Sequence, residues 1–186
     1  MKGWRGAVVG LLLASSAVLA PGSAVFAQQN AELARMFAED QAARRGPDID
    51  WEALRTKDEE RRKAAMALLA AGQIRTAQDY YHAAMIFQHG ESAEEIRLAH
   101  AFATIASALQ SSPAANWLVA ASWDRLLVRF GQPQWYGTQY VRDDEGKWVL
   151  YEVDPDAVTD EQRAERSVPS LEESLKRVEQ LNSGAR

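Results

Sequence analysis

The fold depends most on one stretch rich in alanine and aromatic residues, Ala77-Gln78-Asp79-Tyr80-Tyr81-His82-Ala83-Ala84. Its pattern returns 37 positions later (114 − 77 = 37) in Ala114-Ala115-Asn116-Trp117-Leu118-Val119-Ala120-Ala121. In both stretches, small and aromatic residues recur three or four positions apart, which places them on one face of a helix. The segment between them carries Ala99, Ala103 and Ala106 on one side, where an aromatic ring of a neighbouring helix can pack. The two stretches therefore predict helices that pack in pairs.

The 3.6-residue period of apolar side chains predicts helices along most of the chain. The predicted helices cover 28–45, 51 to about 71, 77–89, 93–109, 114–130, about 159–165 and about 170–181. Asp50 and Thr76 stand where a side chain can cap the second and third of these helices, and Asp79 completes a capping box with Thr76. These short-range signals predict where each helix begins.

The pattern changes near the C-terminus, where Trp135–Arg142 and Lys147–Val153 alternate and are rich in Tyr, Trp, Val and Thr. The turn residues Asp143–Gly146 separate them, so this region is predicted to form a β-hairpin. The expected fold class is mainly α: helical hairpins with a small C-terminal β-hairpin. The stretch Tyr80–Ala84 resembles the tetratricopeptide superfamily, including its Sel1 branch. A plain helical bundle also places alanine at its contacts, and the sequence leaves both arrangements open.

The first 27 residues have the order of a secretory signal peptide. Lys2 and Arg5 form a positive start, and Ala7–Ala20 is an apolar segment shorter than the roughly 20 residues that span a bilayer. Val25-Phe26-Ala27 then offers a cleavage site after Ala27. The alternative is an uncleaved N-terminal anchor.

Cleavage after Ala27 leaves one mostly helical domain at 28–182 and a flexible tail at 183–186, in the periplasm or secreted. The chain has 21 basic and 26 acidic side chains, and the removed segment carries two of the basic ones, so the mature charge is −7. A negative surface excludes nucleic acid as the main partner and does not favour adsorption to anionic lipid, and no stable membrane insertion is expected. Without cysteine the fold has no disulfide. The expected partner is a small polar ligand or another envelope protein, and no cofactor is expected.

Polar residues gather most densely in Asp124-Arg125 and in Gly131-Gln132-Pro133-Gln134-Trp135-Tyr136-Gly137-Thr138-Gln139. Gln134, Thr138 and Gln139 are neutral groups that suit the orientation of a polar ligand better than acid–base chemistry. Their alternative role is local, namely to satisfy the backbone between a helix end and an edge strand.

Asp124 and Arg125 follow an apolar stretch of their helix, so both are expected to be half-buried and paired. Asp124 could bind Arg44 or Arg163, and Arg125 could bind Asp40. Such a network would fix how the N-terminal helix docks on the rest. Arg125 could instead hold an anionic ligand through its planar fork of donors.

The chain has three histidines, His82, His89 and His100. The first two are seven positions apart and share a helix face, and the third can lie level with His82 on the next helix. Together with Asp124 they could hold a zinc ion. Their spacing matches no local metal motif, and a single histidine on an amphipathic helix usually makes an ordinary hydrogen bond, so no metal is predicted.

Five short elements make the sequence resemble a bacterial family of unknown function. They are Asp40-Gln41-Ala42-Ala43-Arg44, Gln88-His89, Asp124-Arg125, Gly131–Gln139, and Asp154 followed by Arg163. The family pattern ends in Gly-Leu-x-Pro-Leu, which Ser167-Val168-Pro169-Ser170-Leu171 matches in part. The resemblance covers about 38–172 and implies one shared site. Its lining would be Asp40, Gln41, Arg44, His89, Asp124, Arg125, Gln134, Tyr136, Gln139 and Arg163.

These residues support three functional hypotheses, and the resemblance does not choose between an enzyme and a binding protein. The leading hypothesis is a binding or interaction module with a polar pocket formed by Asp124-Arg125 and the YGTQ element. The second is an envelope hydrolase or transferase, optionally metal-assisted, in which His89 is a general base or metal ligand, Asp124 orients it, and Arg125 or Arg163 stabilises an anion. The third is a purely structural charge lattice.

Overall fold

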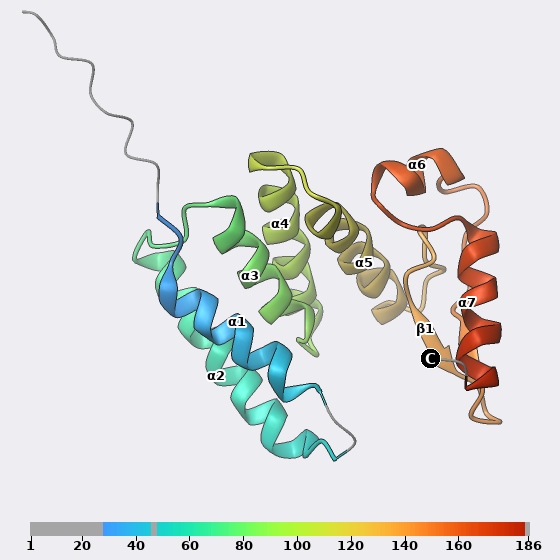
Figure 1. Ribbon diagram of the computed structural model, residues 1–186, viewed down its shortest axis with the longest axis horizontal. Coiled ribbons are helices and arrows are strands. Elements are labelled where there is room, and N and C mark those ends of the chain that lie inside the picture. The colour runs from blue at the N-terminus through green and yellow to red at the C-terminus, as the bar shows by residue number, and fades with distance from the viewer. Residues whose placement is uncertain (1–27, 46–47, 185–186) are drawn as a thin grey trace, which may run out of the picture.

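The computed structural model describes residues 28–45 and 48–184, and the predicted signal peptide with its cleavage site lies outside them. This part is mainly α-helical, with one two-stranded antiparallel hairpin towards its C-terminal end (Figure 1), which confirms the expected fold class. The elements are α1 (Ala31–Ala43), α2 (Trp51–Ala70), α3 (Ala77–Gln88), α4 (Ala93–Leu109), α5 (Pro113–Arg129), β1 (Tyr140–Arg142), β2 (Trp148–Leu150), α6 (Asp160–Glu165) and α7 (Leu171–Ser183). No helix of this described part is both long enough and apolar enough to cross a membrane.

Short-range capping signals begin the helices, as the sequence predicts. The Asp50 carboxylate accepts the N–H of Glu52, and α2 begins at Trp51. Thr76 and Asp79 form the expected capping box before α3. The same reciprocal arrangement begins α4, α6 and α7. Because caps satisfy N–H groups that have no partner within the helix, local chemistry sets these limits.

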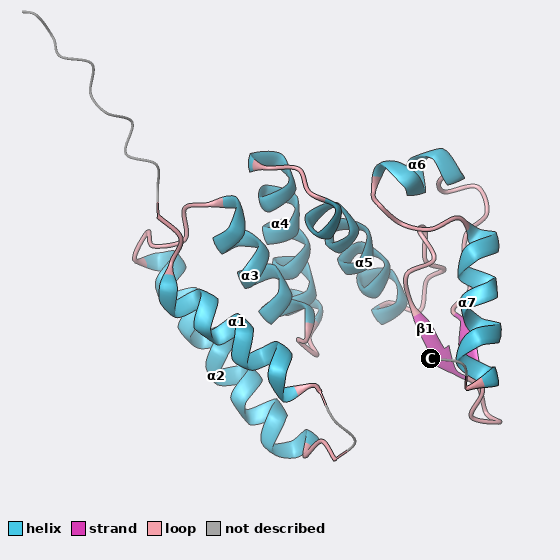
Figure 2. Cartoon of the chain, in the orientation of Figure 1, coloured by secondary structure: helices cyan, strands magenta, loops and turns pink. Residues whose placement is uncertain are grey.

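The β-hairpin is shorter than predicted, with three residues in each strand. Tyr140 pairs with Leu150 and Arg142 with Trp148 on either side of the predicted turn. Figure 2 shows the strands in magenta beside α7. The segment before β1 does not continue this ladder, because its backbone N–H groups bind a side chain of α5. At the C-terminal end, α7 continues to Ser183, so this residue belongs to the helix and not to a flexible tail.

The apolar core lies between helices α1 to α5, which follow one another across the molecule (Figure 1). Ala83 of α3 and Ala99 and Ala103 of α4 are fully buried, so these two helices approach closely. Ala106 is buried on the same side of α4. The predicted face of small residues on α4 is therefore confirmed as a packing surface.

The two aromatic residues of the repeated pattern have different surroundings. The ring of Tyr80 lies 6.2 Å from that of Phe102 on α4 and packs against the core. Trp117 is 40% exposed, and it borders a cavity beside Val168 and Ser174 of the C-terminal elements. Trp117 therefore does not repeat the packing of Tyr80, and a tetratricopeptide-like stack stays a prediction.

The elements after α5 are not joined to helices α1–α5 through the central apolar cluster. We call residues 134–183 the C-terminal unit. The central apolar cluster of the described residues has Val119 as its last member, so this unit adds nothing to it. Within the unit, α7 packs on β2, and the Asn182 amide both accepts from the Trp148 N–H and donates to the Trp148 carbonyl, each at 2.8 Å. Its helices and strands make few contacts with α1–α5, so its attachment depends on the loop between α5 and β1.

One residue other than glycine has a positive φ angle in the described part of the chain: Ser167, at 57°. Its N–H donates to the Ala164 carbonyl, and the Val168 N–H donates to the Arg163 carbonyl. This pair of bonds ends α6 in a left-handed conformation that glycine adopts at least cost.

We expect Ser167→Gly to raise the free energy of unfolding by about 0.5–1 kcal/mol, because glycine removes the Cβ that this conformation crowds. Ser167→Ala is the control, since it keeps the Cβ and should leave stability within about 0.5 kcal/mol of the wild type. Urea denaturation of the three proteins measures the difference. Equal stability of the glycine variant and the wild type would show that this helix end stores no strain.

Candidate functional site

The structure divides the ten candidate residues instead of bringing them into one site. Asp40, Gln41, Arg44 and His89 belong to a network at the N-terminal helices. Asp124, Gln134, Gln139 and Arg163 hold the loop between α5 and β1. Tyr136 borders a cavity, and Arg125 belongs to neither network. No hydrogen bond or ion pair of the described residues joins the two networks.

The first network is built around the Asp40 carboxylate, which is 1% exposed. It accepts hydrogen bonds from Arg44 at 2.7 Å, from Gln41 at 2.8 Å and from His89 at 3.1 Å. Arg44 also forms an ion pair with Asp58 of α2. The network therefore joins α1 to α2 and to the C-terminal end of α3, and it docks the N-terminal helix on the rest of the molecule.

Its partners keep Asp40 charged. Burial alone raises the pKa of Asp40, but the hydrogen bond and charge of His89 and the charge of Arg44 outweigh burial and hold the pKa below its ordinary value. The carboxylate is therefore an anion that orders two basic side chains. The enzyme hypothesis expects Asp124 to orient His89. In the structure, His89 is instead bound by Asp40.

The second network is built around the Asp124 carboxylate of α5, which is 0% exposed. One oxygen accepts the backbone N–H groups of Trp135 at 2.9 Å and Tyr136 at 3.0 Å. The other accepts the N–H of Thr138 at 3.0 Å and its hydroxyl at 2.8 Å. A single side chain of α5 thus holds the whole turn of the loop.

Arg163 of α6 holds the opposite side of the same peptide groups. It is 2% exposed, and it donates to the Trp135 carbonyl at 3.0 Å and to the Tyr136 carbonyl at 3.2 Å. It also pairs with Asp160 at 3.1 Å. The expected ion pair between Asp124 and Arg163 is wrong, because both side chains bind the backbone that lies between them.

Gln134 and Gln139 bind the backbone at the two ends of the loop. The Gln134 side chain, 0% exposed, accepts from the Gln139 N–H at 2.8 Å and donates to the Gln139 carbonyl at 3.0 Å. It also donates to the Tyr151 carbonyl at 2.9 Å. The Gln139 amide donates to the Ala121 carbonyl of α5 at 3.2 Å. These amides satisfy backbone groups, which is the local role that the sequence left open for them.

Two other expected ion pairs are wrong. Asp124 does not bind Arg44, since the loop N–H groups occupy both of its oxygens. Arg125 does not reach Asp40, and its one hydrogen bond in the described structure goes to the Gly90 carbonyl at 3.4 Å. A sequence identifies a charge that needs a partner, but backbone groups serve as partners as well as side chains do.

The three imidazoles lie in different places. His89 is beside Asp40, His100 binds a carbonyl of α5, and His82 stacks on an aromatic ring of α1. The zinc site considered for them with Asp124 is therefore not assembled. Over residues 28–45 and 48–184, no three acidic or histidine side chains are grouped closely enough to hold a metal ion.

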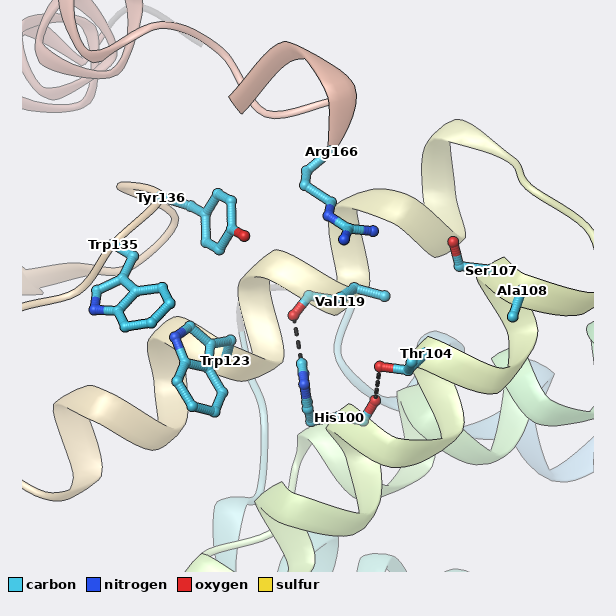
Figure 3. A pocket seen from close by; sticks show the side chains of 9 residues that line it. All are labelled: His100, Thr104, Ser107, Ala108, Val119, Trp123, Trp135, Tyr136 and Arg166. Atoms are coloured by element: carbon cyan, nitrogen blue, oxygen red, sulfur yellow. Dashed lines mark hydrogen bonds between the residues drawn. The ribbon is translucent and has the colours of Figure 1, made fainter. Parts of the chain in front are cut away.

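A cavity of about 550 Å³ opens between α4, α5 and the loop that the second network holds (Figure 3). Its lining is largely aromatic and contains no carboxylate. The lining residues are His100, Thr104, Ser107, Ala108, Val119, Trp123, Trp135, Tyr136 and Arg166. Of the ten candidate residues, only Tyr136 is among them. We call this cavity the aromatic pocket.

The walls of the aromatic pocket pack against one another. The Trp123 and Trp135 rings meet edge to face at 5.1 Å, and His100 lies 5.4 Å from Trp123. The Tyr136 hydroxyl points towards the Arg166 guanidinium (Figure 3). No carboxylate of the described residues lies within ion-pair distance of Arg166. The pocket thus joins an apolar body to one unpaired cation.

His100 is a neutral acceptor in this pocket. Burial lowers the pKa of His100 below its ordinary value, and the nearby charge of Arg166 lowers it further. Its Nδ1 lies 3.1 Å from the Val119 carbonyl, which can only accept, so we assign the ring proton to Nδ1. The other ring nitrogen then has a free lone pair.

The sequence held part of the signal for this pocket. Trp123 precedes Asp124, and Trp135 follows Gln134, so both aromatic residues adjoin residues that the motif singles out. Arg166 gave no signal, because its place in the pocket depends on how α6 docks through Arg163.

Comparisons with protein-family models, with curated proteins and with solved structures find no match for this chain. The resemblance to a bacterial family of unknown function therefore stays a prediction. The case for a site rests on the loop that Asp124 and Arg163 hold and on the cavity beside it.

We expect Asp124→Asn to lower the free energy of unfolding by about 2–3 kcal/mol, since an amide cannot accept all four hydrogen bonds and leaves buried N–H groups without partners. Hydrogen exchange should rise across residues 134–183 while α1–α4 keep their protection, because the apolar core does not include the C-terminal unit. Exchange followed by mass spectrometry measures both regions.

Asp144→Asn is the matched control, because Asp144 is exposed in the hairpin turn and should tolerate the change within about 0.5 kcal/mol. A uniform rise in exchange over the whole chain would contradict a special role of Asp124 in attaching the C-terminal unit.

Proposed function

We propose that this protein is an exported binding protein of the bacterial cell envelope, and that its ligand occupies the aromatic pocket. One observation carries the proposal: the peptide groups of Trp135 and Tyr136 are bound on their N–H side by Asp124 and on their carbonyl side by Arg163. Because the backbone that carries these two rings is fixed before a ligand binds, binding has to order fewer groups and costs less conformational entropy.

The chemistry of the pocket points to a ligand with an aromatic or apolar body and a carboxylate. The rings of Trp123, Trp135 and Tyr136 supply a large apolar contact area. Arg166 supplies a planar fork of donors that fits a carboxylate, and the lining has no acid to compete for it. The free lone pair of His100 can accept a hydrogen bond from a polar group of the ligand.

The polar pocket first expected from the Asp124-Arg125 and YGTQ elements is thus proposed in a modified form. The motif residues hold the loop, and their aromatic neighbours contact the ligand. This combines the binding hypothesis with the charge-lattice hypothesis. It gives the buried network a functional purpose.

A matched set of probes tests the ligand class: phenylacetate, its neutral analogue phenylacetamide and the cation phenethylamine. We expect phenylacetate to quench tryptophan fluorescence and to bind about tenfold more tightly than phenylacetamide, a difference of about 1.4 kcal/mol for the charged contact. Arg166→Gln should abolish this preference. Arg129→Gln is the control, because Arg129 is an exposed arginine of α5 outside the pocket.

The chain has six tryptophans, so quenching alone does not identify the pocket. Trp135→Phe should reduce the quenching by phenylacetate if the ligand binds beside Trp135. Equal binding of the acid and the amide, or an unchanged preference in Arg166→Gln, would refute the proposed ligand class.

Export is tested on the natural chain. Residues directly after the predicted cleavage site make contacts within the folded domain. The Asn30 side chain caps α1, and the Asn30 backbone N–H donates to Asp79 at 2.7 Å. Gln29 lies within hydrogen-bond distance of His82. These contacts are compatible with an N-terminus at Gln28. We expect mass spectrometry of protein recovered from the periplasm or medium to give a chain that begins at Gln28. Recovery of the full-length chain from the cytoplasm alone would contradict export.

A further inference from the structure

Arg125 is the one charged residue among the ten candidate residues that neither network uses. It lies on α5 directly after Asp124, and its Nε is buried with no hydrogen-bond partner in the described structure. Its one hydrogen bond goes to the Gly90 carbonyl at 3.4 Å, near the upper limit for such a bond. Arg125 as a whole is half-buried, but a buried N–H donor without an acceptor costs free energy, so this arginine needs an explanation.

The surroundings of Arg125 form a second cavity of about 450 Å³. It lies between the Gly90–Glu91 loop, the last turns of α5, and β1. Arg129, one helical turn after Arg125, lines the same cavity, and neither arginine forms an ion pair with a carboxylate of the described residues. The aromatic pocket has a different lining, so the two cavities are separate sites.

The only acid in this lining is Glu91. Its charge acts on Arg125 at longer range, where it opposes the effect of burial, which lowers the pKa of Arg125. Glu91 belongs to the turn that begins α4, where its N–H donates to Glu95 at 2.9 Å. The two arginines therefore leave the cavity with a net positive charge in a chain whose overall charge is −5.

Gly90 fixes the position of this turn. A Cβ at Gly90 would lie 2.4 Å from the Cβ of Glu95, so a larger residue does not fit without moving the backbone. The turn is thereby held against the start of α4, and its carbonyl faces Arg125. This turn forms one wall of the cavity that Arg125 and Arg129 also line.

We propose that Arg125 and Arg129 form a binding site for a phosphate monoester, separate from the aromatic pocket. Two guanidinium forks match the three oxygens and the near-double charge of a phosphate monoester at neutral pH. The cavity is larger than a phosphate, and Ile96, Val128 and Val141 line it with apolar surface for the rest of the ligand. The proposal does not depend on the ligand of the aromatic pocket.

Inorganic phosphate is the probe, with acetate as a singly charged comparison, both at constant ionic strength and followed by phosphorus NMR and calorimetry on the mature chain. We expect phosphate to bind with a Kd of about 1 mM or tighter and acetate at least about tenfold more weakly. Arg125→Gln should weaken phosphate binding about tenfold or more, and Arg129→Gln about threefold or more.

Arg166→Gln is the matched control and should bind phosphate as the wild type does, although it loses the preference for phenylacetate over phenylacetamide. If one of the two proposed sites does not bind its probe, the other site can still be tested. If Arg125→Gln does not fold, phosphate binding by Arg129→Gln still tests the proposal. Arg129 is exposed, so this substitution should not disturb folding. Absence of phosphate binding at about 20 mM, equal binding of acetate, or unchanged phosphate binding in both Arg129→Gln and Arg125→Gln would overturn the proposal.

Vesicles of phosphatidylcholine with phosphatidate distinguish two sources of the phosphate group. Sedimentation with these vesicles, lost in Arg125→Gln, would assign a lipid headgroup. A phosphate-dependent NMR signal without sedimentation would assign a soluble ester. Both results support the site, whereas sedimentation that persists in Arg125→Gln together with no phosphate signal would exclude it.

Discussion

The arrangement of the C-terminal half depends on the buried carboxylate of Asp124. Among the described residues it has no basic side chain within ion-pair distance, and three backbone N–H groups and one hydroxyl compensate its charge. Such charge-assisted bonds are stronger than neutral ones, and stranding a buried charge costs several kcal/mol, so the loop stays bound. Since the central apolar cluster ends within α5, Asp124, together with the Trp123–Trp135 contact and the bond from Gln139 to Ala121, joins the C-terminal unit to α5.

Three residues that line the aromatic pocket lie close in sequence to residues of this polar network. Trp123 precedes Asp124, Trp135 follows Gln134, and Arg166 lies one helical turn after Arg163. The network therefore sets the pocket by setting backbone positions, and the pocket residues themselves make few polar contacts. This division explains why the motif is polar although the cavity is mostly aromatic: the motif satisfies the backbone of an irregular loop, which has no ladder or helix to do so.

The sequence predicted what depends on neighbours along the chain. Asp50 and Thr76 cap their helices as expected, because a cap involves residues two or three positions away. The partners of Asp40 and Asp124 were predicted wrongly, since these charges could be satisfied by any cation or N–H group that the fold brought near. Arg166 could not be predicted at all, because its place in the pocket depends on how α6 docks against a loop far from it in sequence.

Among residues 28–45 and 48–184, no carboxylate forms an ion pair with Arg125 or Arg166. Acids outnumber bases in the chain, 26 to 21, so a shortage of acids does not explain this. The chain supplies partners elsewhere: Arg44 binds two carboxylates, and Arg163 binds one carboxylate and two carbonyls. Both unpaired arginines border cavities whose walls come partly from the α1–α5 core and partly from the C-terminal unit. An anion in either cavity would contact both parts at once. Because a ligand that binds only the joined state stabilises it by mass action, binding at either arginine and the attachment held by Asp124 must reinforce each other.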